Sequence, residues 1–378
     1  MRLPRARSRL AYAAFLAGMA LCGSYVLWVG ARSWRAYEFL KSEHRGFRGR
    51  VHRADPELGF AAVPASQGWH VFPVGPPLPM RYSAEEFRVP AHDPGASPRR
   101  RPFVLALGCS FTYGDACAAE DTWPFLVAQG LGGTALNAGK CAYGLSQVLI
   151  LARRLVPRYR PDYVLVQFSP WLVGRGTSGF ARSTFGLVPV PYLTFEGGRV
   201  GVEPPCFRAR VFDLPFHRFD NARRGAGEFL SFLFAAGGPL FVHDDLHLAA
   251  CELRRLGGSS PEAARRRAVD SAGEVNRVVY REIARICRDN AATMALVRLS
   301  HPLERHHQQL KELYREVVYV DAQAALDAAV PAADGKEGYY RRFGHWRGAP
   351  PVLVDTHPNP AAHRLIASEV LRRLPAAR

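Results

Sequence analysis

The sequence predicts an α/β fold built around a parallel β-sheet. Short continuous apolar runs, with no alternation of polar positions, are typical of strands that are buried on both faces of such a sheet. Helical stretches separate these runs, and this alternation of buried strand and helix is the pattern of a parallel α/β sheet. The expected strands are residues 103–107, 163–168, 293–299 and 317–320, and the expected helices are 122–129, 145–155, 261–289 and 303–314.

The length and composition fit one large folded domain with additions. Of the 378 residues, 48% are hydrophobic and 22% are charged, a balance that excludes wholesale disorder. Residues 32–101 are rich in Gly, Pro and Arg, so we expect a linker followed by a small β-rich lead-in. The α/β domain then covers residues 102–378, with an insertion at about 170–250. Part of it, residues 176–216, forms either a lid or substrate groove, or a structural insertion with its own small core.

The net charge of +17 raises the question of an acidic partner. All but four of the 50 basic residues are Arg, and they are scattered along the chain. No zinc-finger, RNA-binding or helix-turn-helix signature accompanies them. We therefore expect no nucleic-acid partner, and we attribute the Arg content to a GC-rich genome rather than to a binding surface.

The first 31 residues predict a membrane anchor. A basic tail at residues 1–9 precedes an uncharged apolar run at 10–31, which as a helix would reach about 33 Å, enough to cross a bilayer. A cleaved signal peptide usually has a shorter apolar run, and Cys22 lacks the neighbours expected of a lipoprotein cysteine. We expect a single-pass N-terminal anchor with the folded domain on the periplasmic or extracellular side, although Arg residues flank both ends of the run.

A candidate nucleophile lies directly after the first buried strand. Ser110 stands in the segment Gly108-Cys109-Ser110-Phe111-Thr112-Tyr113-Gly114-Asp115, at the expected carboxyl end of strand 103–107. Open α/β sheets bind their ligands at that edge. A serine placed there can point into a cleft, with backbone N–H groups directed at a developing oxyanion.

A candidate general base lies near the end of the chain. In Asp355-Thr356-His357-Pro358-Asn359-Pro360, a carboxylate precedes an imidazole by two positions, just before an amphipathic helix. Such a pair can serve as an oriented base for a serine. The alternative is that Asp355 caps the helix and that His357 is a surface loop residue.

Together these two segments resemble the SGNH/GDSL hydrolase superfamily. Gly-x-Ser-Phe-Thr-x-Gly resembles its block I, and Asp-x-His-Pro-Asn resembles its block V. The segment Asn137 to Gln147 resembles block II, and residues 163–168 resemble the strand that leads to block III. The segments Asp55 to Phe60 and Glu86 to Arg88 are similar to exported bacterial members.

This resemblance implies a flavodoxin-like three-layer α/β/α sandwich and acyl-ester chemistry. Ser110 would be the nucleophile, His357 the base and Asp355 the group that orients the base. The oxyanion hole would use the N–H groups of Ser110 and Ala142, and a third donor from block III.

Two positions depart from the pattern of the superfamily. Ala142 stands where block II usually has Gly, and a positive φ there would be strained. Trp171 stands where block III usually has Asn, so its role as an oxyanion donor is doubtful. Asn137 and the hydroxyl of Ser169 are the alternative donors, and Trp171 could instead be a stacking platform for a sugar ring. The Asp-x-His spacing is also one residue shorter than the usual one.

Other polar residues predict little further chemistry. Cys117 and Cys141 flank the expected site, where they either pair or remain two thiols. His243 and His247 share a helix face but have no third ligand, so we expect no metal and no cofactor.

The expected function is that of a serine esterase or O-acyltransferase acting on an acylated small molecule or polysaccharide of the cell envelope. A catalytically weak scaffold or polysaccharide-binding protein on the same fold is the alternative, and a lipid esterase is a third possibility that rests only on the anchor.

Overall fold

The computed structural model describes residues 4–41, 46–92, 99–183, 186–196, 199–214, 225–258, 261–301, 308 and 310–375. Within these residues the molecule is built on a nine-stranded sheet in the order β1-β4-β5-β6-β8-β7-β9-β14-β15. In sheet order the strands are Gly46–Arg48, Gln67–Val71, Leu78–Tyr82, Arg88–Val89, Thr134–Asn137, Phe103–Leu107, Tyr163–Phe168, Thr293–Arg298 and Val318–Asp321.

The five strands from β8 to β15 are parallel, as the sequence predicts. The strands expected at 103–107 and 163–168 match β7 and β9, and those expected at 293–299 and 317–320 match β14 and β15 to within one residue. β7 lies inside the parallel part, between β8 and β9, and its residues from Val104 to Leu107 have no solvent exposure. Burial on both faces explains the unbroken apolar runs.

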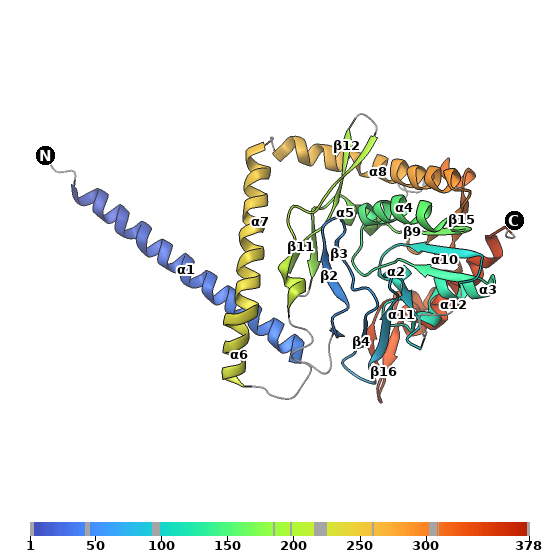
Figure 1. Ribbon diagram of the computed structural model, residues 1–378, viewed down its shortest axis with the longest axis horizontal. Helices are drawn as coiled ribbons and strands as arrows, with labels where there is room; N and C mark the ends of the chain where they lie inside the picture. Colours follow the sequence, from blue (N-terminus) through green and yellow to red (C-terminus); the bar gives the residue numbers. More distant parts are fainter. Residues whose placement is uncertain are drawn as a thin grey trace.

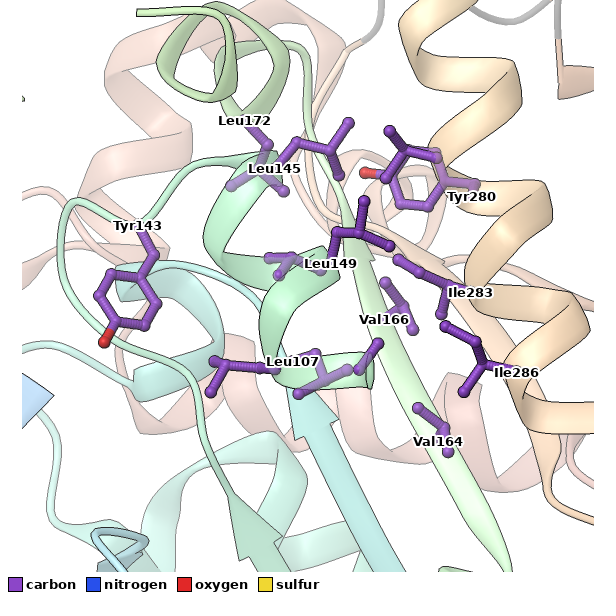
Figure 2. Packing of buried hydrophobic residues seen from close by; sticks show 14 of the residues in the cluster. Leu107, Tyr143, Leu145, Leu149, Val164, Val166, Leu172, Tyr280, Ile283 and Ile286 are labelled. Carbon is purple, nitrogen blue, oxygen red and sulfur yellow. The ribbon is translucent and has the colours of Figure 1, made fainter. Parts of the chain in front are cut away.

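Helices cover both faces of the parallel strands and complete a three-layer sandwich (Figure 1). Leu105 and Leu107 pack toward α4 and α8, whereas Val104 and Ala106 pack toward α3 and α12, because successive strand residues point to opposite faces. Figure 2 shows the first of these cores, where Leu149 of α4 and Ile283 of α8 meet Val166 of β9. The covering helices are α4 (Leu145–Tyr159) and α8 (Pro261–Asp289) on one face, and α3 (Trp123–Gly130), α10 (Ala322–Ala328) and α12 (Pro360–Arg373) on the other.

The lead-in expected at 32–101 is not a separate unit. Its strands β1, β4, β5 and β6 extend the main sheet by antiparallel pairing, and β6 joins β8 through the Arg88–Asn137 pair. Two further strands, β2 (His52–Asp55) and β3 (Gly59–Ala62), form a hairpin of their own. Local sequence patterns cannot predict the join to the main sheet, because β6 and β8 are about 50 positions apart in the chain.

The N-terminal helix α1 runs from Pro4 to Lys41, so it continues ten residues beyond the expected end at residue 31. Its segment Arg9–Lys41 is long and apolar enough to cross a membrane. α1 projects from the body of the molecule at its N-terminal end (Figure 1). Its C-terminal part is buried at Val29, Ala36, Tyr37 and Leu40, so residues 32–41 belong to the folded domain and not to a linker.

The insertion supplies the surface against which α1 packs. Phe232 and Phe241 of the insertion share a core with Tyr37, and Arg32 pairs with Asp245 at 2.5 Å. The insertion and the C-terminal part of α1 therefore form one small core together, apart from the cores on the two faces of the sheet. Its elements are α5 (Pro170–Gly176), the hairpins β10–β11 (Phe180–Ser183, Gly186–Pro189) and β12–β13 (Tyr192–Glu196, Arg199–Glu203), α6 (Ala226–Phe232), a π-helix (Leu233–Gly237) and α7 (Gly238–Gly258).

The elements after β14 complete the sheet and position the C-terminal motif. The helix expected at 303–314 lies largely outside the described residues, and its described end is a single 3-10 turn at Leu313–Arg315. Then come α10, α11 (Gly335–Phe343), the hairpin of β16 (His345–Arg347) and β17 (Val352–Asp355), and α12. β17 ends at Asp355, so the hairpin positions the loop that carries His357.

Candidate active site

Ser110 begins the short helix α2 (Ser110–Tyr113), directly beyond the carboxyl end of β7. The sharp turn into this helix depends on Gly108, because a Cβ there would lie 2.2 Å from Thr112 Oγ1 and 2.6 Å from Gln167 Oε1. Gln167 of β9 fixes the turn, since its Oε1 accepts hydrogen bonds from Cys109 N (3.0 Å) and Thr112 Oγ1 (2.8 Å). The adjacent strand therefore holds the serine in place.

The structure brings Ser110, His357 and Asp355 into one hydrogen-bonded chain. His357 Nε2 lies 3.0 Å from Ser110 Oγ, and His357 Nδ1 lies 2.7 Å from Asp355 Oδ1. The same Asp355 oxygen accepts the backbone N–H of His357 at 2.7 Å. With Nδ1–H donated to the carboxylate, Nε2 is left to accept the serine proton.

The charges of the site suit this proton transfer. Burial alone would raise the pKa of Asp355, but its hydrogen bonds from His357 lower the pKa to about 2, so the carboxylate is ionised at neutral pH. Burial alone would lower the pKa of His357, but the hydrogen bond to Asp355 and the negative charge of Asp115 raise it above its ordinary value. The imidazole is thus a stronger base than a free histidine.

Asn359, and not Asp355, caps the terminal helix. Its Oδ1 accepts the N–H groups of Ala361 and Ala362, each at 3.0 Å, while its Nδ2 donates to Arg342 O (2.9 Å) and Gly344 O (3.0 Å). These bonds fix the loop from Asp355 to Asn359 between α11 and α12. The alternative for this segment, with Asp355 as a cap and His357 as an unattached surface residue, is wrong.

Two backbone N–H groups, those of Ser110 and Ala142, are candidates for an oxyanion hole. Ala142 has φ +64°, a left-handed conformation that is strained for a residue with a side chain. Lys140 N donates to Gly108 O at 3.2 Å and so joins the Ala142 loop to the Ser110 loop. Among the described residues, neither Ser110 N–H nor Ala142 N–H has an acceptor within the protein. Both donors are therefore free for a ligand oxygen.

The three candidates for a third donor have other partners. The Trp171 indole N–H points at Cys109 Sγ, 3.4 Å away. Asn137 is bound at both ends of its amide, donating to Thr112 O (3.1 Å) and accepting from Gly139 N (3.0 Å). Ser169 Oγ is buried and accepts from Gln167 Nε2 at 2.9 Å. Trp171 and Asn137 therefore use their N–H groups elsewhere, and the Ser169 hydroxyl has no solvent exposure.

Asp115 is a member of the site to which sequence reasoning gave no role. Its Oδ2 lies 3.9 Å from His357 Nε2, and its Oδ1 accepts a hydrogen bond from Cys141 Sγ at 3.0 Å. His70 Nδ1 approaches the same carboxylate at 4.0 Å. The available signal was the position of Asp115 directly after the block I segment.

Arg88 is a second residue whose role sequence reasoning missed. Its buried guanidinium donates to Tyr113 O and Gly114 O, at 2.5 Å each, and to Cys117 O. It also lies 4.2 Å from the centre of the Tyr113 ring. Arg88 therefore holds the loop after the nucleophile, although its sequence context gave only a family resemblance.

The minor candidates have structural partners. Cys117 and Cys141 are free thiols and donate to Pro358 O (3.4 Å) and Asp115 Oδ1, so the pairing alternative is not realised. His243 and His247 lie side by side on α7, with ring centres 4.4 Å apart. Asp244 between them accepts the backbone N–H groups of Arg210 and Val211.

Comparisons with known proteins find only remote similarity. No family model and no curated protein sequence matches the chain. Solved structures similar to it include a protein of the lipolytic G-D-S-L family from Desulfitobacterium hafniense DCB-2, with 11% identity over 72% of this chain and 100% of that one, and a TM-score of 0.32. TesA gives 11% identity, 73% and 99% coverage and a TM-score of 0.35.

A third similar structure is a catalytic mutant of Axe2, an acetylxylan esterase from Geobacillus stearothermophilus. It shares 12% identity with this chain, covers 74% of it and 98% of its own length, and gives a TM-score of 0.33. TM-scores of this size carry no argument about fold or activity, so the description of the fold depends on the strand order and on the loops that meet at Ser110. The described residues form a three-layer α/β/α architecture in which Ser110, His357 and Asp355 are joined by hydrogen bonds.

Proposed function

We propose that the protein is a serine esterase or O-acyltransferase that acts on acyl esters of cell-envelope or extracellular carbohydrate. The observation that carries the proposal is the hydrogen-bonded chain from Ser110 Oγ through His357 to Asp355. A histidine without a catalytic role is not expected to be oriented by a half-buried carboxylate with its second nitrogen on a serine hydroxyl. Together with two backbone donors that have no acceptor within the described residues, this is the arrangement of a nucleophilic serine.

The reaction follows from the positions of these groups. Ser110 Oγ attacks the ester carbonyl carbon while its proton passes to His357 Nε2, and the carbonyl oxygen becomes an oxyanion at the N–H groups of Ser110 and Ala142. The tetrahedral intermediate then releases the alcohol, which takes the proton from Nε2, and the acyl group remains on Ser110. Water or a sugar hydroxyl, deprotonated by His357, removes the acyl group. The acceptor decides between hydrolysis and transfer.

The membrane segment supports a location at the cell envelope. In this proposal residues 10–31 form a single-pass anchor and the α/β domain lies on the periplasmic or extracellular side, beside acylated surface polymers. A lipid esterase would share the anchor, but no other observation favours it.

A catalytically weak scaffold or polysaccharide-binding protein is the second candidate. The specific observation in its favour is that Trp171, Asn137 and Ser169 all bind other groups. Loss of one oxyanion donor typically costs a factor of about 10²–10³ in rate, so the site would be slow without it.

Ester hydrolysis by the purified full chain in detergent tests the proposal. With 4-nitrophenyl acetate as substrate, we expect turnover that Ser110→Ala abolishes and that His357→Gln lowers at least about 10²-fold. Arg364→Gln, at an exposed position of α12, is the matched control. Turnover that persists unchanged in Ser110→Ala would assign the activity to a contaminant and favour the scaffold.

A further inference from the structure

A cavity of about 660 Å³ adjoins the catalytic loop. It lies beyond the carboxyl end of β14, between α10, α11 and the loop that carries His357. Thr356 and Pro358, on either side of His357, line it, and so does Phe111, the neighbour of Ser110. A molecule in this cavity would therefore lie next to the reacting groups, at the edge where α/β sheets bind ligands.

Aromatic rings from two parts of the chain line the cavity. At the catalytic end, the rings of Phe111 and Trp171 lie 5.2 Å apart, and the indole N–H of Trp171 is already bonded to Cys109. On α11, the rings of Tyr339 and Tyr340 lie 5.8 Å apart, edge to face. Rings held in this way offer apolar faces to a ligand, and the C–H faces of a pyranose ring match them.

Charged and polar groups also line the cavity. Asp327 of α10 accepts a hydrogen bond from Gln323 Nε2 at 2.8 Å and lies 3.4 Å from His301 Nε2. Lys336 of α11 lies 5.6 Å from the centre of the Tyr340 ring. All four polar residues line the cavity. The lining thus offers hydrogen-bond donors and acceptors as well as a charge of each sign.

This mixture does not suit a long acyl chain. An acyl chain would remove water from the Asp327 carboxylate and the Lys336 ammonium without replacing the lost hydrogen bonds, which costs free energy. A sugar ring covers the aromatic faces with its C–H groups and replaces the lost water with its own hydroxyls. We propose that this cavity, the cleft between α10 and α11, binds the sugar portion of an O-acylated carbohydrate. The proposal rests on the esterase or acyltransferase function proposed above.

The sugar ring would stack on Tyr340, and its hydroxyls would bond to Asp327. An ester oxygen on that sugar would then reach Ser110 past Phe111, with the small acyl group on the side of Ala142. In this arrangement the cleft recognises the alcohol part of the ester. The acyl transfer to Ser110 is the same for every acetyl ester.

Two acetyl esters that differ in the alcohol test this proposal. Full-length protein in detergent is assayed on monoacetylated cellobiose and on 4-nitrophenyl acetate. Tyr340→Ala and Asp327→Asn should each lower the ratio of kcat/KM for the sugar ester to kcat/KM for the nitrophenyl ester about tenfold, mainly through KM. Glu337→Gln, on α11 but outside the lining, should leave the ratio unchanged.

Three results separate failure of the cleft from failure of the proposed function. An equal loss on both esters, or turnover of 4-nitrophenyl acetate but not of the sugar ester, would overturn the cleft and leave the esterase intact. A rate that instead rises steeply from 4-nitrophenyl acetate to the octanoate, and loses this rise in Tyr340→Ala, would assign the cleft to an acyl chain. If the wild type cleaves no ester, saturation-transfer NMR with cellobiose decides. Binding that weakens in Tyr340→Ala supports the cleft, and absence of binding overturns it.

Discussion

Asp115 Oδ2 lies 3.9 Å from His357 Nε2, the nitrogen that also bonds Ser110 Oγ. The base of the candidate triad therefore has a carboxylate near each ring nitrogen, since Asp355 holds Nδ1 at 2.7 Å. In the reaction Nε2 becomes positively charged, so Asp115 stabilises the imidazolium from the side of the serine.

Removing the negative charge of Asp115 should shift the dependence of kcat/KM on pH to lower pH. Burial lowers the pKa of His357, whereas Asp355 and Asp115 raise it above its ordinary value. Only the neutral imidazole acts as a base, so activity is lost as the pH falls through this pKa. In Asp115→Asn the pKa drops, and the acid limb of kcat/KM against pH should shift to lower pH.

The control for this experiment is Glu120→Gln, which removes a nearby charge that pairs with exposed His92 at 3.8 Å. Its acid limb should coincide with that of the wild type. An unchanged acid limb in Asp115→Asn, or one that moves to higher pH, would show that Asp115 does not act on His357.

Trp171→Phe tests the third oxyanion donor. Because the indole N–H is bonded to Cys109 Sγ at 3.4 Å, its loss should cost less than about tenfold in kcat on 4-nitrophenyl acetate. Trp171→Asn would introduce the donor that block III usually has, and we expect its kcat to equal or exceed that of Trp171→Phe. A loss of about 10² or more in Trp171→Phe would instead identify the indole as a true oxyanion donor.

Lys140 should make the stability of the fold depend on pH. Its side chain is buried, donates to Tyr82 OH at 3.2 Å, and burial lowers its pKa from 10.5 to about 7. The unfolded chain therefore binds more protons between about pH 7 and pH 10.5, so stability rises with pH across that window, and the full penalty is present below it. Lys140→Met should stabilise the protein by about 1–3 kcal/mol at pH 6 and by much less at pH 10.

Denaturant unfolding of the wild type and Lys140→Met at both pH values measures this difference. Lys336→Met, which removes an exposed ammonium, is the control. Equal stabilisation at pH 6 and pH 10 would mean that the Lys140 charge is not penalised in the folded state.

Truncation separates the membrane part of α1 from its folded part. Deletion of residues 1–28 should give a soluble, folded protein, because Val29, Ala36, Tyr37 and Leu40 remain in the core with Phe232 and Phe241. Deletion of residues 1–45 removes these four side chains and should lower the melting temperature or cause aggregation. Equal stability of the two truncated proteins would contradict the packing of α1 against the insertion.

The side of the membrane is a separate prediction. A periplasmic reporter fused after Arg378 should be active, and the fusion should stay in the membrane fraction at full length. Activity of a cytoplasmic reporter alone, or a soluble product cleaved near residue 31, would contradict the anchor proposed for residues 10–31.

The sequence was a good guide wherever the deciding interactions are local. The unbroken apolar run at 103–107 predicts β7 because burial on both faces leaves that pattern, and Ser110, His357 and Asp355 are candidates from the sequence because each lies in a short motif of consecutive residues. Arg88 and Asp115 could not be predicted. Their roles depend on carbonyls and an imidazole that approach from other elements, and no local pattern encodes that approach.

The same reason explains two features of the fold that were not predicted. Residues 32–41 look like a linker because their partners, Phe232 and Phe241, are about 200 positions away. The pairing of the β-rich lead-in with the main sheet has no local signal, because β6 joins β8 only through Arg88 and Asn137. Neither contact leaves a periodic signal in the chain.

The most direct test of the central claim is covalent labelling of the serine. The full chain in detergent is treated with a fluorophosphonate probe, and the adduct is located by mass spectrometry. We predict one adduct, on the peptide that contains Ser110, which is absent in Ser110→Ala and forms at least about 10²-fold more slowly in His357→Gln. No adduct on Ser110 in the wild type, or labelling at the same rate without His357, would contradict the account.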